Sequence, residues 1–294
     1  MSDEVRMGGG FSILPPVVKN LLILNILFFV AKFAFKRIGV DLDALLGLHF
    51  FSASSFHFWQ PITYMFMHGN FEHLFFNMFA LWMFGAAVEN HWGSKKFLIY
   101  YMVTGFGAGL AHYVVLTFSL YPDLVLMNGF LEAPSWENFQ QIVAHHTFHL
   151  TSDDPQFVAL QQTAAQVAHD PTNAYALNHL TVLVSSYKDY FLNLHNVIGA
   201  SGAIFGVMMA FAMLFPDSQI YIYFLLPIKA KWFVIFYGVL ELLYGVLGTS
   251  DGVAHFAHLG GMLFGLILIL LWRRKDKQKH FDNTQDEWYS DTSY

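Results

Sequence analysis

Long apolar stretches alternate with polar segments along the chain. A helix needs about 20 mostly apolar residues to cross a bilayer, and six stretches come near that length: residues 17–38, 72–89, 95–119, 199–215, 231–248 and 254–272. The fourth is short and begins in a Gly-rich turn, which predicts a helix that starts below the membrane surface. The pattern predicts an all-α membrane protein, a bundle of six transmembrane helices.

One polar segment, residues 120–198, separates the third and fourth stretches and is too polar to span a membrane. Its apolar residues recur at helical spacing, as at Phe157, Leu160, Ala164 and Val167. We therefore expect an insert of two or three amphipathic helices on the outer face, which is also suited to act as a lid. The expected organisation is an N-terminal segment 1–16, a membrane domain 17–272 that contains the insert 120–198, and a tail 273–294.

Composition and charge support a membrane protein and predict its orientation. Hydrophobic residues make up 55% of the chain and charged residues 12%, against about 25% charged residues in soluble domains. Lys188 is the only basic residue of segments 39–71, 120–198 and 249–253, so the positive-inside rule predicts that both termini are cytoplasmic. Lys36 and Arg37, at the predicted outer end of the first helix, are the exception to this charge pattern. Short loops and no visible targeting peptide favour a bacterial inner membrane.

Groups suited to acyl transfer occur in the first turns of three predicted helices. The second helix carries His73 and Asn77, the fourth begins near Ser201, and the sixth carries His255 and His258. In the predicted topology these helices all enter the membrane from outside, so their first turns lie at similar depth. The chain has no cysteine, which excludes a thiol nucleophile and disulfides. Ser201 is the candidate nucleophile, with a neutral histidine as its base.

Small residues predict close packing of the fourth and sixth helices. Gly202 and Gly206 are four residues apart, as are Gly261 and Gly265, and such faces let helices approach closely in membranes. This packing would bring Ser201 within hydrogen-bond reach of one of the two histidines.

A tetrahedral intermediate also needs hydrogen-bond donors for its oxyanion. The candidates are the Ser201 N–H at a helix start and the side chains of His73 and Asn77. No acidic residue stands beside His258 in the sequence, and Asp251 in the preceding loop is a weak candidate for a third member.

Three segments resemble motifs of the rhomboid proteases. Residues 199–206 resemble the family's GASGAxxG segment, residues 257–265 its AHxxGxxxG segment, and residues 67–77 its HxxxxHxxxN stretch. Glu89 with Gly93 and Ser94 resembles the loop that joins helices two and three. Two departures are the insert, which is untypical of the family, and Trp59-Gln60, which stands where many members have Trp-Arg.

The resemblance implies a rhomboid six-helix bundle and an intramembrane serine endopeptidase. This hydrolase would cleave single-pass transmembrane substrates near the outer side of the bilayer, with no cofactor, metal or nucleic acid. It implies Ser201 and His258 as the catalytic pair, His73, Asn77 and the Ser201 N–H as the oxyanion hole, and structural roles at the site for Gly199, Gly202, Gly261 and Gly265.

Other interpretations stay open. One is a proteolytically silent rhomboid-like protein that binds membrane helices, although such proteins usually lack one member of the catalytic pair. A transporter or channel would favour internal repeats, and none is found. A metal at His145, His146 and His149 has no supporting motif. We interpret His68 and His255 as structural residues.

Overall fold

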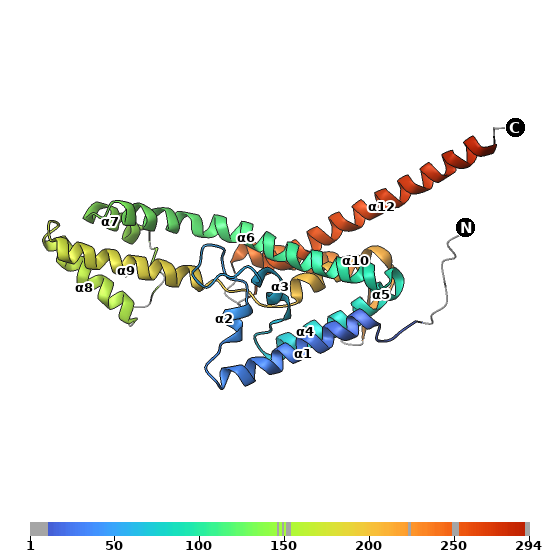
Figure 1. The fold of residues 1–294 in the computed structure, drawn as a ribbon, viewed down its shortest axis with the longest axis horizontal. Coiled ribbons are helices and arrows are strands. Elements are labelled where there is room, and N and C mark those ends of the chain that lie inside the picture. Colours follow the sequence, from blue (N-terminus) through green and yellow to red (C-terminus); the bar gives the residue numbers. More distant parts are fainter. Residues whose placement is uncertain are drawn as a thin grey trace. The chain divides into compact units, whose positions relative to one another are not determined.

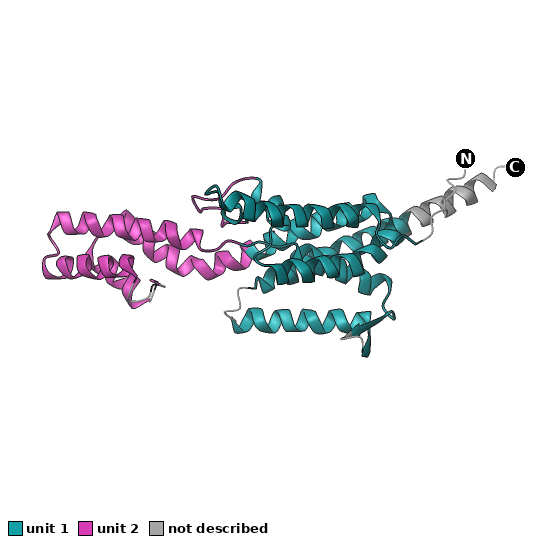
Figure 2. Cartoon of the chain, turned by 90° about the horizontal axis from the view of Figure 1, so that it is seen from below, with its two compact units in different colours: residues 1–47, 59–112, 197–294 teal, residues 48–58, 113–196 magenta. Residues whose placement is uncertain are grey.

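The computed structural model describes residues 11–145, 147, 148, 150, 154–222, 225–248 and 253–291, and the side chains of the last helix as far as residue 276. The chain forms two compact units (Figure 2). Unit 1 consists of Met1–Gly47, Trp59–His112 and Val197–Tyr294, and unit 2 of Leu48–Phe58 and Tyr113–Asn196. The residues of the predicted catalytic pair and oxyanion hole all belong to unit 1.

Unit 1 is a bundle of helices (Figure 1). Its longer helices are α1 (Pro16–Lys36), α4 (Phe71–Ala80), α5 (Ala86–Trp92), the first part of α6 (Ser94–Glu132), α10 (Ser201–Leu214), α11 (Ala230–Leu247) and α12 (His255–Asp291). A π-helical turn at Leu81–Gly85 joins α4 to α5. Two short helices, α2 (Leu42–Leu46) and α3 (Gln60–Thr63), and a 3-10 turn at Tyr64–Phe66 lie between α1 and α4 in the chain.

Five helices in the described part of the chain are long and apolar enough to cross a membrane: Pro16–Lys36, Phe71–Trp92, Ser94–Glu132, Ala230–Leu247 and His255–Asp276. The fourth predicted stretch forms α10, which has 14 residues and is shorter than a span. Most of α10 is buried because α4, α5, α11 and α12 pack against it. The prediction of a helical membrane bundle is therefore confirmed, with a short helix in its interior.

Two helix boundaries differ from the predicted ones. α6 passes through Pro122 to Glu132 instead of ending at residue 119. A proline inside a helix costs about 3 kcal/mol, and burial of Leu120, Met127 and Phe130 in the core of unit 2 offsets this cost. α12 continues past residue 272 because lysine and arginine are good helix formers.

A small hairpin that the sequence pattern did not predict connects α10 to α11. Its strands β1 (Gln219–Ile222) and β2 (Leu226–Lys229) are antiparallel, with Gln219 opposite Lys229 and Ile222 opposite Leu226. The adjacent Asp217 carboxylate binds the Lys229 ammonium at 3.0 Å and that of Lys231 at 2.9 Å. These exposed ion pairs lie at the end of α10 that is distant from Ser201.

Unit 2 is helical and has its own hydrophobic core. The second part of α6 packs with α7 (Trp136–Ala144), α8 (Pro155–His169) and α9 (Ala174–Asn193). Each of the last three helices begins at a side chain that accepts a hydrogen bond from a first-turn N–H: Ser135, Asp154 and Asn173. The core includes Met127, Phe130, Phe139, Ile142, Leu160, Val167, Leu180, Val184 and Tyr187.

Candidate active site

Glycines allow α10 and α12 to touch along their backbones. A Cβ atom added to Gly261 would lie 1.8 Å from the carbonyl oxygen of Gly202, and one added to Gly265 would lie 3.4 Å from Gly206 Cα and 2.3 Å from the Tyr100 hydroxyl of α6. Any larger side chain at these positions would push the helices apart. The close approach fixes the first turn of α12 beside the first turn of α10.

Ser201 and His258 meet at this crossing. Ser201 is the first residue of α10, and His258 lies in the first turn of α12. The Ser201 Oγ is 2.8 Å from His258 Nε2. Phe205, one turn after Ser201, stacks on the imidazole with ring centroids 4.3 Å apart and an angle of 7° between the rings. The stacking holds the ring in the orientation that directs Nε2 at the hydroxyl.

A carboxylate that the sequence analysis did not consider lies on the other edge of the imidazole. The Glu241 Oε2 is 2.9 Å from His258 Nδ1 and 2.7 Å from His255 Nδ1. The contact with His255 is a well-aligned hydrogen bond. The contact with His258 is slightly longer and does not meet hydrogen-bond geometry. Asp251, the acid weighed from the sequence, lies outside the described residues.

A signal for Glu241 was present in the sequence. It is the only acidic residue of the predicted span 231–248, and an ionisable group within a membrane helix is a functional candidate. Its neighbours Leu242, Leu243 and Val239 are half exposed, whereas Glu241 is 9% exposed. The acid therefore faces the bundle interior, and the apolar residues around it face outward.

His73, Ser201 and Gly199 surround one small space. A Cβ added to Gly199 would lie 2.9 Å from His73 Cε1, 3.0 Å from His73 Nε2 and 3.4 Å from Ser201 Oγ. Gly199 has φ +141°, a conformation that other residues rarely adopt. Its N–H donates to the Tyr64 carbonyl at 2.9 Å. Glycine is thus required here both by the backbone and by the space between the histidine and the serine.

Asn77 follows His73 by one turn of α4 and is 7% exposed. Its Nδ2 has no hydrogen-bond partner among the described residues. Buried polar groups are nearly always paired, so an unpaired buried amide calls for an explanation. An amide donor kept available for a ligand oxygen would explain it.

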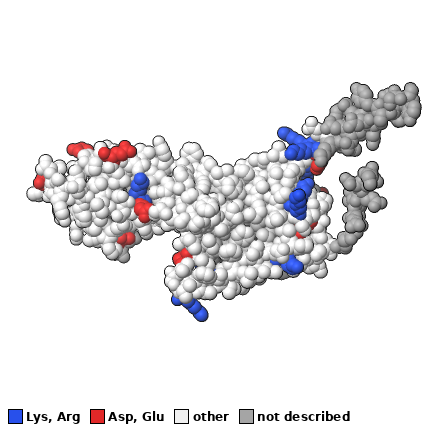
Figure 3. All heavy atoms as spheres, viewed as in Figure 1, with Lys and Arg blue, Asp and Glu red and all other residues white. Residues whose placement is uncertain are grey.

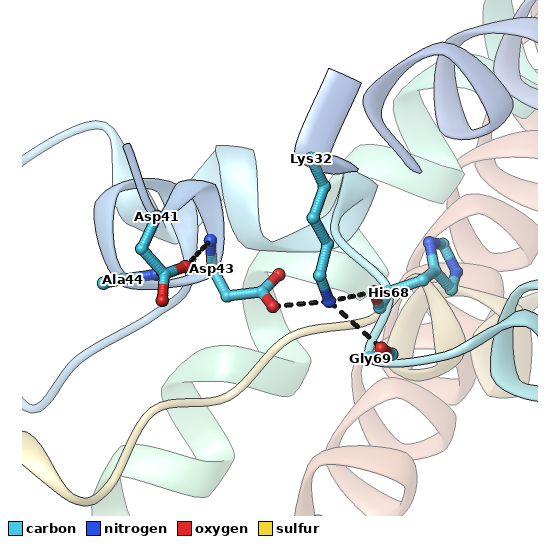
Figure 4. A network of polar contacts seen from close by, with 6 residues as sticks. All are labelled: Lys32, Asp41, Asp43, Ala44, His68 and Gly69. Carbon is cyan, nitrogen blue, oxygen red and sulfur yellow. Dashed lines mark hydrogen bonds and ion pairs between the residues drawn. The ribbon is translucent and has the colours of Figure 1, made fainter. Parts of the chain in front are cut away.

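A lysine clamp holds the loop before α4 (Figure 4). The Lys32 ammonium on α1 binds the Asp43 carboxylate of α2 at 2.5 Å. It also donates to the carbonyls of His68 and Gly69, each at 3.0 Å. Asp41 caps α2 by accepting from the N–H groups of Asp43 and Ala44. The clamp connects α1 and α2 to the segment that leads into His73.

The His68 side chain is fully buried behind His73, and their rings meet edge to face with centroids 5.0 Å apart. Burial, together with the nearby His73 and Lys32, disfavours the imidazolium and lowers the pKa of His68 to about 3. His68 is therefore neutral at physiological pH and acts as an apolar support for the His73 ring.

Two groups of residues have side chains of the types that bind divalent metals. The ligand atoms of Glu241, His255 and His258 all lie within 4.8 Å of one another, so these residues have the right types and spacing to hold a divalent ion. In unit 2, His145 Nδ1 pairs with Asp123 at 3.3 Å. His146 and His149 lie outside the described residues.

Comparison with known proteins groups these features in one family. The model of the Rhomboid domain matches residues 55–124 and 163–275, more than half of the chain. The chain is 24% identical to an uncharacterized mitochondrial rhomboid protein of Schizosaccharomyces pombe over 225 residues, which is 74% of this chain and 52% of that protein.

Two further relatives match shorter regions. The chain is 40% identical over 65 residues to the rhomboid protease GluP of Bacillus subtilis, covering 22% of this chain and 12% of that protein. It is 32% identical over 96 residues to the chloroplastic rhomboid-like protein 11 of Arabidopsis thaliana, covering 33% of this chain and 32% of that protein. The chain thus spans about half the length of these relatives or less.

Proposed function

Since the chain belongs to the rhomboid family, as its motifs predicted, we propose that it is an intramembrane serine endopeptidase. The observation that carries the proposal is the 2.8 Å contact between Ser201 Oγ and His258 Nε2. These two residues are 57 positions apart in the chain and lie on different helices. A serine and a histidine at hydrogen-bond distance are the minimal unit of nucleophilic catalysis. One relative, GluP, is named a protease.

The proposed mechanism assigns one role to each group. Ser201 attacks the carbonyl carbon of the scissile peptide bond while its proton moves to His258 Nε2. The oxyanion of the tetrahedral intermediate accepts hydrogen bonds from Asn77, His73 and the Ser201 N–H at the start of α10. His258 then gives its proton to the leaving amine, and a water molecule hydrolyses the acyl-enzyme by the same steps. Gly199, Gly202, Gly261 and Gly265 keep the helices close enough for this geometry.

The proposed substrates are single-pass transmembrane proteins, cleaved near the outer side of the bilayer. The charges of unit 1 support this orientation (Figure 3). Arg273 donates to the Met213 carbonyl at the end of α10, and Lys229 and Lys231 lie at that same end. Ser201 is at the opposite end of the helix, so a cytoplasmic basic end places the serine toward the outside.

The type of membrane stays a prediction. Two relatives are named as mitochondrial and chloroplastic, and the third comes from a bacterium. These names give no support to the bacterial inner membrane expected from the sequence. The five candidate spans indicate an integral membrane protein.

Cleavage of a single-pass reporter in liposomes tests the proposal. Wild type should cleave, whereas Ser201→Ala and His258→Ala should not, and a fluorophosphonate should label wild type at Ser201. Equal cleavage by all three proteins would refute the assigned residues. If wild type neither cleaves the reporter nor is labelled by the fluorophosphonate, the result would favour the silent, helix-binding alternative.

A further inference from the structure

We propose that Glu241 is a positioning residue for the Ser201–His258 pair, with His255 holding its carboxylate in place. The inference rests on the proposed function and extends it from two residues to four. It adds an acid from α11, a helix that carries no residue of the predicted site.

The first argument is the placement of the two partners of His258. Ser201 Oγ is 2.8 Å from Nε2, and Glu241 Oε2 is 2.9 Å from Nδ1. The hydroxyl and the carboxylate thus lie on opposite edges of one ring, whose face is covered by Phe205. This is the order nucleophile, base, orienting acid that defines a serine triad by geometry rather than by sequence.

The second argument concerns which ring nitrogen of His258 carries the proton. A neutral imidazole has one N–H and one acceptor nitrogen, and an ionised carboxylate only accepts. A carboxylate beside Nδ1 therefore favours the tautomer with the proton on Nδ1. Nε2 is then free to accept the Ser201 proton, which is the state that a general base requires. Without Glu241 nothing else in the described contacts of Nδ1 selects this tautomer.

The third argument is the burial of the acid. Glu241 is 9% exposed and His255 is 7% exposed, and a buried carboxylate is costly unless it is hydrogen-bonded. The 2.7 Å bond from His255 Nδ1 supplies that partner. His255, which we interpreted from the sequence as a structural residue, thus acts on the carboxylate and not on the serine. Its Nδ1–H also fixes the position of Oε2.

The proton balance of the reaction follows directly. When Ser201 attacks, its O–H bond breaks and a new N–H bond forms at His258 Nε2. The imidazolium that results lies between the serine oxygen and the Glu241 carboxylate. Glu241 stays ionised throughout and stabilises this cation, and the proton leaves with the amine product.

A metal held by the same three side chains is the competing interpretation. The Glu241 oxygen is already at hydrogen-bond distance from both nitrogens, 2.7 and 2.9 Å. A zinc ion would replace these contacts by bonds of about 2.0–2.2 Å to each ligand. It would also occupy Nδ1 of His258. The direct contacts therefore favour a positioning acid over a metal centre.

The test uses the full chain in liposomes and compares wild type with Glu241→Gln, Glu241→Asp and the control Glu137→Gln. Glu137 is an exposed residue of α7 and undergoes the same chemical change away from the site. We expect Glu241→Gln to lower kcat by roughly 10²–10⁴-fold with KM within about twofold of wild type. Glu241→Asp should recover part of kcat, because the charge remains, and Glu137→Gln should match wild type.

A second readout needs no substrate. In ¹⁵N-histidine NMR, the His258 signal, assigned by its loss in His258→Ala, should show the Nδ1–H tautomer in wild type and a shift toward Nε2–H in Glu241→Gln. An unchanged tautomer, or a loss confined to KM, would overturn the inference. Cleavage that is lost in EDTA and restored by Zn²⁺ would overturn it in favour of a metal.

The two readouts separate the failure of this inference from that of the proposed function. A wild type that neither cleaves nor reacts with a fluorophosphonate contradicts the protease, whereas the tautomer still decides the role of Glu241. An active wild type whose Glu241→Gln variant keeps full kcat and the same tautomer contradicts only the role of Glu241. If Glu241→Gln fails to fold, both measurements are made on Glu241→Asp. A partly lowered kcat with the Nδ1–H tautomer retained would support the positioning role, whereas a kcat equal to wild type or a Nε2–H tautomer would refute it.

Discussion

At the scale of single residues, a substitution of Asn77 should affect stability and activity differently. Its buried Nδ2 has no partner among the described residues, and leaving such a group unpaired costs about 1–3 kcal/mol. Asn77→Leu removes that cost at similar volume. We expect a midpoint of thermal unfolding equal to or above that of wild type, together with a kcat lower by roughly 10²–10³-fold, the effect of losing one oxyanion donor.

The measurement combines reporter cleavage with thermal unfolding in detergent. A variant that is both destabilised and inactive would show that Asn77 is a packing residue. A variant with full activity would remove it from the oxyanion hole. Asn138→Leu, in unit 2, is a control for the same substitution outside the proposed site.

Protonation of the buried His68 destabilises the folded state. Its pKa is about 3 in the folded chain and 6.5 in the unfolded chain. Between these values the unfolded chain binds a proton that the folded chain does not, so the free energy of unfolding falls as the pH falls from 6.5 toward 3. The slope reaches up to about 1.4 kcal/mol per pH unit for this one group.

We therefore expect His68→Phe to lose less stability than wild type between pH 7 and pH 4.5. Thermal unfolding of both proteins in detergent at the two pH values measures the difference. Equal losses would show that other groups set the acid sensitivity and that the buried state of His68 is not the cause.

At the scale of elements, the Lys32 clamp links α1 and α2 to the start of α4. Lys32→Met keeps the length of the side chain but removes three contacts, to Asp43, His68 and Gly69. We expect a loss of about 1.5–3 kcal/mol in the free energy of unfolding, the range for hydrogen bonds to a charged group. Since the loop before His73 is released, kcat should fall as well.

Lys36→Met is the matched control, because Lys36 is an exposed residue on the same helix. Adding Asp43→Asn to Lys32→Met should restore part of the stability, as the carboxylate no longer lacks its cation, but not kcat. A double variant that recovers kcat would show that the charge of Asp43, and not the held loop, caused the defect. Unfolding by denaturant and reporter cleavage give the two quantities.

The elements also show what the sequence could and could not predict. Hydropathy predicted six spans, and five helices of the described part of the chain are long and apolar enough to cross a membrane. It also predicted that the fourth stretch is short, and α10 is shorter still at 14 residues, because a helix covered by its neighbours does not need the length of a span. The continuation of α6 through Pro122 depends on burial of Met127 and Phe130 by distant segments, which no local pattern contains.

The candidate active site also combines residues that a local sequence pattern predicts with one residue that only the fold brings into place. The spacing of His73 and Asn77, and the glycines beside Ser201 and His258, are local patterns, so they could be predicted from the sequence. Glu241 precedes His258 by 17 positions on a different helix. Whether it faces lipid or His258 depends on the rotation of α11 in the bundle, which three-dimensional packing determines.

At the scale of the whole molecule, the two ends of unit 1 differ in chemistry. At one end Glu89 accepts hydrogen bonds from the first N–H groups of α1, at Val17 and Val18, and from the Ser94 hydroxyl. Lys95 and Lys96 follow directly in the chain. At the other end α1 reaches the loop that leads into His73. α1 has 21 residues, so its ends are roughly 30 Å apart, about the thickness of the hydrocarbon core.

This arrangement makes orientation measurable, because the natural chain has no cysteine and a single introduced thiol reports its side of the membrane without background. Lys95→Cys should be labelled by a membrane-impermeant maleimide only after the membrane is opened. Ile38→Cys, 73% exposed just beyond α1, should be labelled in intact cells. Tyr175→Cys, 82% exposed in the insert, should behave like Ile38→Cys if the insert is on the outer face.

Each pattern of labelling has a distinct meaning for the proposed protease. The reverse result, with Lys95→Cys labelled in intact cells and Ile38→Cys protected, would place Ser201 toward the cytoplasm, and the exception at Lys36 and Arg37 would then be the true orientation signal. Labelling of Ile38→Cys but not Tyr175→Cys in intact cells would keep the orientation of the bundle and contradict the outer position of the insert. Because Ser201 lies at the end of α10 opposite Arg273, the side that labels at Ile38 is also the side from which water must reach the serine.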